Sequence, residues 1–210
     1  MTKVKICGLM RTADAEAVNE AEADFAGFVF AGSRRKISHD TAAELRSVLD
    51  PAIPAVGVFV DADEREIAEL AEAGTIQMVQ LHGNEDEAYI RRVKKETGLP
   101  VIKALLLGET PDEDSLRTMI AGACAGAADY LLFDTGRGTG MTFRWRTLAG
   151  LRDMIEKPYF AAGGLTPDNV GEAAAVLLPY AADVSGGVEN ADGYKDENMI
   201  REFVRRAKSE

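Results

Sequence analysis

The chain has 210 residues, 46% of them apolar and 28% charged, a size and composition that suit one soluble α/β domain better than two small ones. No apolar run approaches the roughly 18 residues that cross a bilayer, and the N-terminal MTKVKICG lacks the apolar core of a secretory signal, so we expect a cytoplasmic protein with no membrane partner. The formal net charge of −11 and the lack of a basic run argue against nucleic acid as a partner.

Eight apolar segments rich in β-branched and aromatic residues predict strands along the chain. They span residues 4–7, 25–30, 55–60, 78–83, 101–107, 130–135, 159–164 and 182–188. Helical periodicity fills the intervals between them, most clearly at 65–74 and 197–207, where apolar residues recur every three or four positions. The pattern is therefore an alternation of strands and helices.

Candidate caps mark several of these helices. Asn84 is predicted to cap the helix that follows it, and Gly98 is predicted to end that helix. The pairs Thr110-Pro111 and Thr166-Pro167 each predict an N-cap followed by proline at the first helical position.

Strands that alternate with helices pair in parallel, because a parallel neighbour is reached only through a crossover connection. Eight such units at intervals of roughly 20–30 residues predict a closed (β/α)8 TIM barrel of eight parallel strands, with residues 1–210 as a single domain. An open, doubly wound sheet is the alternative. No linker or low-complexity tract divides the chain.

Cys7 is one of only two cysteines and stands at the end of the first predicted strand. In a barrel the active site forms at the C-terminal ends of the strands, where nearby cations lower the pKa of a thiol and make it a usable base. Side chains alternate along a strand, so Lys5 lies one layer below Cys7 and is predicted to pair with Asp183. The alternative for Cys7 is a buried, small apolar residue.

Asp134 ends the sixth predicted strand and is followed by the glycine-rich TGRGTG, which favours a functional acid over a helix cap. Two cysteines and two histidines give no recognisable zinc spacing, so no metal site is predicted. Gln80 and His82 share one face of the fourth strand, and either a structural role or a place at the mouth fits them.

Glycine clusters follow the last two strands, at Gly163-Gly164 and, after Ser185, at Gly186-Gly187. Loops at these positions of many barrels offer backbone N–H groups to a phosphate, and glycine permits the close approach. The two clusters together predict a phosphorylated small-molecule substrate. Arg34, Arg35 and Lys36 follow the second strand, and a cationic cluster in an acidic protein favours a second substrate anion, such as a carboxylate.

Taken in order, the motifs of the chain strongly resemble those of phosphoribosylanthranilate isomerase, the tryptophan-pathway enzyme. They are KICGL, GFVF with S-x-R-x-IS, VGVFV, VQLHGNE, LLFDT with GTG and F-x-W, AGGLTPDNV, and DVSGGVE with G-x-KD and I-x-x-F. Each motif alone is weak, whereas the ordered set runs through almost the whole chain.

The resemblance implies an Amadori rearrangement of N-(5-phosphoribosyl)anthranilate without metal or cofactor. It implies that Cys7 is the general base and Asp134 the general acid. By the same resemblance, Arg35 holds the anthranilate carboxylate, and the glycine loops with Ser185 bind the phosphate. A monomer and a homodimer are both compatible with the sequence.

Two departures from the family pattern concern the loops. The chain has GRGTG, with Arg137, where GGTG is common, and Gly186 stands where a second serine is frequent. The histidine-pathway isomerase and its dual-substrate relative are the nearest rival barrels, but both are expected to carry aspartate where this chain has Cys7. A catalytically silent barrel that binds a phosphorylated metabolite is the alternative from another class.

Overall fold

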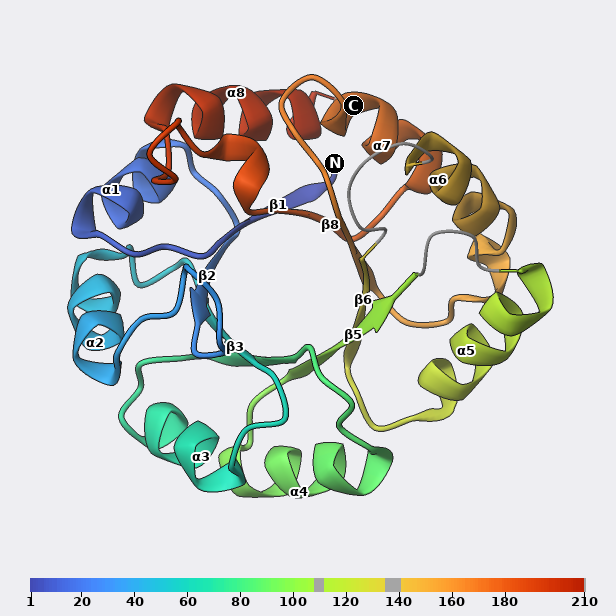
Figure 1. The fold of residues 1–210 in the computed structure, drawn as a ribbon, viewed down its shortest axis with the longest axis horizontal. Helices are drawn as coiled ribbons and strands as arrows, with labels where there is room; N and C mark the ends of the chain where they lie inside the picture. The colour runs from blue at the N-terminus through green and yellow to red at the C-terminus, as the bar shows by residue number, and fades with distance from the viewer. Residues whose placement is uncertain (108–111, 135–140, 210) are drawn as a thin grey trace.

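The strands of this computed structural model pair in chain order, and β8 returns to β1 to close a parallel barrel (Figure 1). The structure describes residues 1–107, 112–134 and 141–209, leaving the side chains of 141–144 aside. The strands are β1 Lys3–Cys7, β2 Phe25–Val29, β3 Ala55–Phe59, β4 Met78–Leu81, β5 Val101–Leu106, β6 Tyr130–Asp134, β7 Tyr159–Ala162 and β8 Ala181–Val184. The predicted eight-stranded barrel is confirmed, and an open sheet is excluded because β1 pairs with both β2 and β8.

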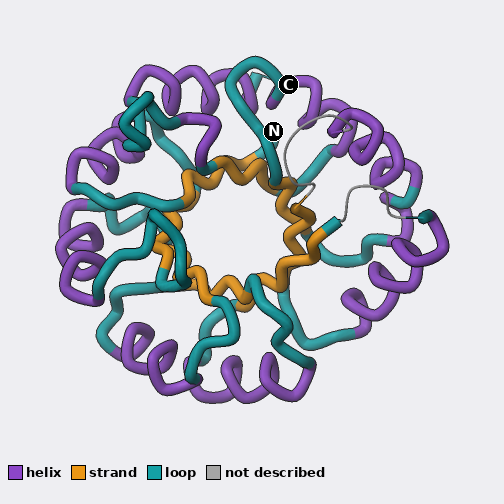
Figure 2. The backbone as a smooth tube through the Cα atoms, viewed as in Figure 1, coloured by secondary structure: helices purple, strands orange, loops and turns teal. Residues whose placement is uncertain are grey.

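The helices form an outer ring around the strands (Figure 2). They are α1 Thr12–Glu20, α2 His39–Val48, α3 Glu64–Glu72, α4 Glu87–Thr97, α5 Glu113–Ala125, α6 Met141–Gly150, α7 Val170–Leu177 and α8 Glu197–Lys208, with 3₁₀ turns η1 Arg152–Met154 and η2 Gly186–Val188. The eighth strand is shorter than predicted, because the chain leaves the sheet after Val184 and its second glycine cluster turns into η2.

Apolar side chains pack on both sides of the strand ring. The larger cluster lies between strands and helices, and the smaller one fills the barrel interior with residues such as Phe25, Met78 and Phe160. Inward and outward residues alternate along each strand, as strand geometry requires. The interior is therefore a packed plug, and the polar inward residues Lys5 and Asp183 sit next to it.

The helix starts differ from their predictions because other side chains form the caps. Asp86, not Asn84, caps α4 by accepting a hydrogen bond from the Tyr89 backbone N–H at 2.7 Å. That helix ends at Gly98 with φ of 68°, as predicted. For α5 the cap is Asp112; the predicted pair Thr110-Pro111 lies outside the described residues.

The predicted start at Thr166-Pro167 is also wrong, because a turn precedes α7. The backbone N–H of Asn169 donates to the carbonyl of Thr166 at 3.2 Å. The side-chain oxygen of Asn169 accepts a hydrogen bond from the backbone N–H of Thr166 at 2.8 Å. Residues 167–169 lie in this turn, so the helix begins at Val170.

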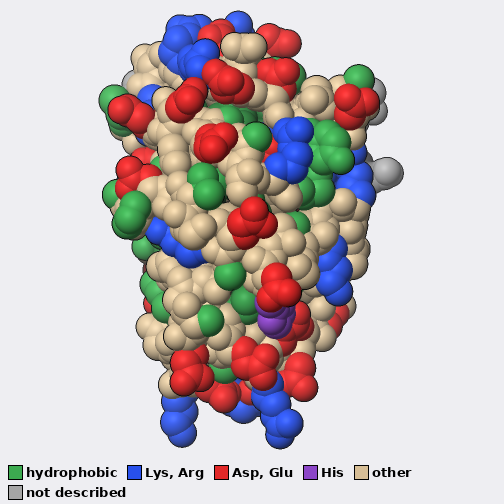
Figure 3. All heavy atoms as spheres, turned by 90° about the vertical axis from the view of Figure 1, so that its left-hand side faces the viewer, with side chains coloured by type: hydrophobic (Ala, Val, Ile, Leu, Met, Phe, Trp, Pro, Cys, Tyr) green, Lys and Arg blue, Asp and Glu red, His purple; other side chains and the backbone are tan. Residues whose placement is uncertain are grey.

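Charged side chains of both signs are interspersed over the face shown in Figure 3. Within the described ranges, no helix combines the length and the apolarity that a membrane crossing needs.

Candidate active site

All eight residues predicted for the site line one cavity of about 390 Å³ at the C-terminal ends of the strands. They are Cys7, Arg35, Asp134, Gly163, Gly164, Ser185, Gly186 and Gly187. A cavity of similar volume, about 410 Å³, opens at the other end between Lys3, Asp24 and Tyr180. Because barrel chemistry is built from the loops at the C-terminal ends, the first cavity is the candidate site.

Cys7 ends β1 and points into the barrel beside Lys5. Gly27 on β2 makes this possible, because a Cβ there would stand 2.7 Å from the Cys7 sulfur. Lys5 is fully buried, and its ammonium donates to Asp183 Oδ1 at 2.9 Å, so the predicted pairing is confirmed. A charge pair of this kind keeps Lys5 protonated inside the barrel.

The pKa of the Cys7 thiol is raised, against the sequence-based expectation. Burial is the largest cause, because it disfavours the thiolate; the charges of Lys5 and Lys195 act in the opposite direction. The pKa of Lys5 is also raised: burial alone lowers it, but the negative charges of Asp183 and Cys7 outweigh that effect. The cationic surroundings of the thiol are therefore present, yet desolvation outweighs them.

Asp134 ends β6, and its side chain is about one quarter exposed in the cavity wall. Asp134 Oδ2 lies 3.6 Å from His82 Nε2, and the other ring nitrogen of His82 is 3.0 Å from Gln80 Nε2. With the Gln80 amide as donor, this nitrogen of His82 is the acceptor. Gln80 Oε1 is buried without a hydrogen-bond partner among the described residues.

The loops that carry the two glycine clusters, after β7 and β8, meet at Leu165 and Gly187. Gly163 and Gly164 have φ values of 96° and 64°, a region that favours glycine. A Cβ on Gly187 would lie 1.8 Å from the Leu165 carbonyl oxygen, so only glycine lets the two loops meet at this distance. Ser185 and η2 then bring their backbone to the same cavity wall.

Arg35 reaches the cavity from the loop after β2, and Glu189 holds its guanidinium. Arg35 Nε donates to Glu189 Oε1 at 2.6 Å, and Nη2 donates to Oε2 at 3.0 Å. Arg34 bonds to the same carboxylate. Lys195 Nζ lies 3.0 Å from Glu189 Oε1 and donates to the Ser185 carbonyl at 3.0 Å.

Sequence reasoning missed Glu189 and Lys195, although both belong to the motifs that carried the resemblance. The only hint in the sequence was that a carboxylate and a lysine lie six residues apart in the loop after the last strand. Nothing in that spacing says that the two meet, since the loop has no regular period. Arg137, the predicted departure near Asp134, lies outside the described residues.

The charges in this cluster support one another. Burial alone raises the pKa of Glu189, but hydrogen bonds from Arg35 and Lys195 and their positive charges bring it down to about 2. The pKa of Lys195 is lowered, mainly by burial, although Glu189 opposes this. The hydrogen bond to Glu189 raises the pKa of Arg35. Glu189 is thus an ionised carboxylate at neutral pH.

No group of three His, Cys, Asp or Glu side chains in the described ranges is placed to hold a metal ion.

Comparison with known proteins connects the site to one family. Residues 4–206 match the family model described as N-(5'phosphoribosyl)anthranilate (PRA) isomerase. The N-(5'-phosphoribosyl)anthranilate isomerase of Endomicrobium trichonymphae is 45% identical, with both chains covered in full. A solved phosphoribosyl anthranilate isomerase in complex with reduced 1-(o-carboxyphenylamino)-1-deoxyribulose 5-phosphate superposes with a TM-score of 0.86 and 34% identity, again over both full chains. A solved structure of monomers of the dimeric phosphoribosylanthranilate isomerase from Thermotoga maritima superposes with a TM-score of 0.84 and 33% identity, with full coverage of both chains.

Proposed function

Because this chain belongs to the N-(5'-phosphoribosyl)anthranilate isomerase family, we propose that Cys7 and Asp134 are the base and the acid of the family's reaction. The chain catalyses the Amadori rearrangement of N-(5-phosphoribosyl)anthranilate to 1-(o-carboxyphenylamino)-1-deoxyribulose 5-phosphate, a step of tryptophan biosynthesis.

The chemistry needs an acid and a base at separate positions. Asp134 donates a proton to the ring oxygen, the bond from that oxygen to the anomeric carbon breaks, and an iminium forms. The iminium makes the C2′ hydrogen acidic, and the Cys7 thiolate removes it. The resulting enolamine tautomerises to the ketone. Cys7 and Asp134 end β1 and β6, and both line the same cavity, which supports this division of roles.

The substrate's two anions are assigned to two sides of the cavity. Arg35 offers N–H groups in a fixed fork, which suits the planar anthranilate carboxylate. The backbone of Gly163-Gly164 and Gly186-Gly187, together with Ser185, surrounds the phosphate. Fixing both ends orients the reacting carbon between Cys7 and Asp134, so binding energy supplies the geometry.

The observation that carries the assignment is that a thiol, a carboxyl group and two predicted anion sites meet in one cavity of about 390 Å³. The decisive experiment is a fluorescence assay of the purified protein with phosphoribosylanthranilate, with and without EDTA. We expect turnover that chelator leaves unchanged, because the proposed steps use only proton transfer. Loss of activity in EDTA would contradict this scheme.

Three further assignments rest on the family as well. We take residues 1–210 as one isomerase domain, since pairing of β1 with β8 joins the two ends of the sequence. Cytoplasmic placement fits a biosynthetic enzyme. A monomer and a homodimer are both compatible with the fold, and the dimeric relative from Thermotoga maritima supports the homodimer.

A further inference from the structure

We propose that Glu189 is a positioning residue for the substrate: its carboxylate holds the Arg35 guanidinium in the cavity wall, and Lys195 fixes that carboxylate from the other side. This inference rests on the proposed function, in which Arg35 binds the anthranilate carboxylate. It gives a role to two charged side chains that the proton-transfer scheme does not use.

The contact between Glu189 and Arg35 has the geometry of a support. Two parallel bonds, from Nε at 2.6 Å and from Nη2 at 3.0 Å, fix both the place and the plane of the guanidinium. Glu189 takes two of the five N–H groups of Arg35, so the same side chain still has donors for a ligand. The Glu189 side chain is 3% exposed and that of Arg35 is 15% exposed. The supporting group is thus buried, and the supported one borders the cavity.

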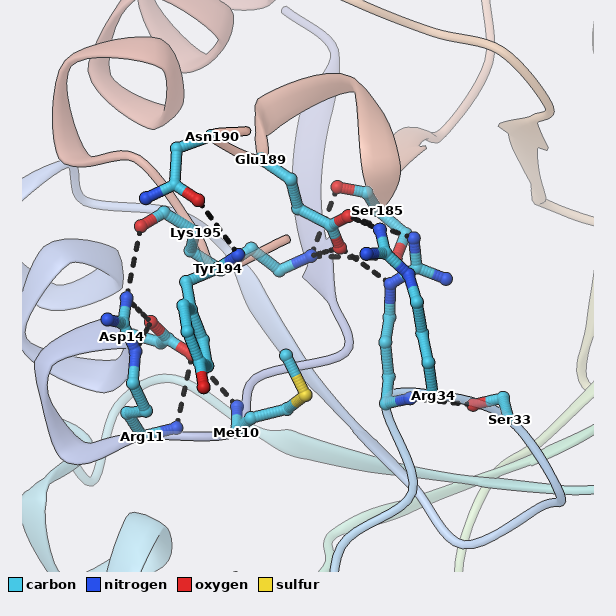
Figure 4. Close-up of polar contacts among 11 residues, drawn as sticks. Met10, Arg11, Asp14, Ser33, Arg34, Ser185, Glu189, Asn190, Tyr194 and Lys195 are labelled. Atoms are coloured by element: carbon cyan, nitrogen blue, oxygen red, sulfur yellow. Dashed lines mark hydrogen bonds and ion pairs between the residues drawn. The ribbon is translucent and has the colours of Figure 1, made fainter. Parts of the chain in front are cut away.

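Lys195 ties this support to the loop after β8. Its side chain is fully buried, and Nζ lies 3.0 Å from both Glu189 Oε1 and the Ser185 carbonyl oxygen (Figure 4). The residue before it, Tyr194, lies under the Arg11 guanidinium, whose carbon is 4.1 Å from the ring centre. Arg11 Nη2 donates to the Lys195 carbonyl at 3.3 Å. The wall that carries Arg35 is therefore anchored to the start of α1 and to the proposed phosphate loop.

Glu189 could instead compete with the substrate for the guanidinium, but its surroundings argue against this. Arg34, Arg35 and Lys195 all contact the same carboxylate, so a substrate that displaced it would leave a buried charge without Arg35. Its pKa of about 2 keeps it ionised throughout the neutral range. A carboxylate that is held from three sides acts as a fixed part of the wall.

The experiment measures kcat and KM for wild type, Glu189→Gln, Arg35→Met and the double variant, and the affinity of each for reduced 1-(o-carboxyphenylamino)-1-deoxyribulose 5-phosphate by calorimetry. Glutamine keeps the size of Glu189 but loses the charge-assisted pair, so we expect KM and the dissociation constant to rise roughly 10- to 100-fold, with kcat changed by less than about threefold. In the Arg35→Met background the same substitution is expected to add little, because it acts through Arg35.

Glu85→Gln is the matched control. Glu85 is a buried carboxylate, 1% exposed, whose Oε2 lies 2.7 Å from Lys103 Nζ, and it does not border this cavity. It is expected to lower stability while leaving KM in place. If Glu189→Gln alone does not fold, Glu189→Gln with Lys195→Met removes both buried charges and is read in the same way.

The outcomes separate the inference from the proposed function. Wild-type turnover, a weakened Arg35→Met variant and an unchanged KM in Glu189→Gln would overturn the positioning role alone. A KM that falls in Glu189→Gln would overturn the positioning role too. If Glu189 competed with the substrate for Arg35, removing its charge would free the guanidinium and lower KM. Equal losses in both backgrounds would show that Glu189 acts independently of Arg35. A wild-type protein that neither turns over nor binds the product analogue would remove the proposed function, and the inference with it.

Discussion

At the scale of single residues, the assignment of acid and base is open to a direct test. Cys7→Ser replaces the thiol by a far weaker acid, and Asp134→Asn keeps the shape of the side chain but removes its proton. General acid–base steps contribute about 10²–10⁴-fold each, so each variant is expected to lose kcat/KM by that factor in the fluorescence assay.

Cys124→Ser is the control for these two variants. Cys124 lies half-buried on α5, with its sulfur 3.7 Å from the Met154 carbonyl oxygen, away from the cavity. Its kcat/KM should match that of wild type. A loss of less than tenfold in both Cys7→Ser and Asp134→Asn would refute their roles.

Strand geometry alone predicted one of the contacts near the site. Alternation along β1 and β8 was enough to predict that Lys5 meets Asp183, because a strand has a fixed period. Glu189 and Lys195 escaped prediction since they lie in an irregular loop. The direction of the Cys7 pKa also escaped, because desolvation depends on how completely the neighbouring strands cover the thiol, and the local sequence does not report that.

Lys5 gives the sign of a second prediction. The positive charge of Lys5 lowers the pKa of the Cys7 thiol, against the larger effect of burial. Lys5→Met removes that charge, so the thiol pKa should rise further. A base works only when it is deprotonated, so kcat/KM falls as the pH drops below the pKa of the thiol. In the variant, this acidic limb of the pH profile of kcat/KM should move to higher pH.

Alkylation of Cys7 by iodoacetamide measures the same pKa without turnover, in a Cys124→Ser background. The control is Lys103→Met. Lys103 is another carboxylate-paired lysine on a strand, with Nζ 2.7 Å from Glu85, and it does not border the cavity. Its removal should cost stability and leave the alkylation profile in place. An alkylation profile that stays fixed in Lys5→Met would rule out this influence.

At the scale of elements, the meeting of the two glycine loops gives a third prediction. Gly187→Ala places a Cβ against the Leu165 carbonyl at 1.8 Å, and a backbone atom cannot move aside as a flexible side chain can. The loops after β7 and β8 must separate, so we expect KM for phosphoribosylanthranilate to rise at least roughly tenfold, as misplacement of binding groups by about 1 Å can cost more than that.

Gly122→Ala serves as the opposite case. Gly122 lies inside α5, with nothing within 4 Å of an added Cβ. Alanine there should raise the free energy of unfolding by about 1 kcal/mol in urea titrations and leave KM unchanged. An unchanged KM in Gly187→Ala would mean that the loop contact does not shape the site.

The elements themselves were predicted better than their ends. Apolar runs fixed the place of each strand to within a few residues, whereas two helix starts were wrong. In both cases several polar residues in a row were able to cap, and tertiary contacts decided which one did so. At α4, Asp86 accepts the hydrogen bond from the backbone N–H of Tyr89. At α7, the side chain of Asn169 accepts a hydrogen bond from Thr166 and closes a turn ahead of the helix.

At the scale of the whole molecule, the closed topology followed from period and count. Eight alternating strand–helix units are the number that a closed parallel barrel needs. Pairing of β8 with β1 closes the sheet and removes both of its edges. The same topology gathers residues as distant as Cys7 and Ser185 into one cavity. What the sequence could not predict is the charge cluster that joins the loops after β2 and β8, because it depends on three-dimensional contacts between them.

Acid stability of the whole chain tests that cluster. The folded-state pKa of Glu189 is about 2, below its ordinary value of 4.5, so its contribution to stability is complete above about pH 5 and is lost as pH falls toward 2. Glu202 on α8 also has a pKa of about 2, set by Arg205 and Arg206 at the exposed surface. Both carboxylates should therefore make the free energy of unfolding fall with acidification.

Salt separates the two contributions. Surface pairs are screened at high ionic strength, whereas a pair of which one partner is 3% exposed is screened much less. In urea titrations between pH 7 and 3, the difference in the free energy of unfolding between wild type and Glu202→Gln should become small in about 1 M NaCl. The difference between wild type and Glu189→Gln should persist in salt and narrow only as pH falls. If salt removes both differences equally, Glu189 is solvated, and the rigid wall proposed for Arg35 does not exist.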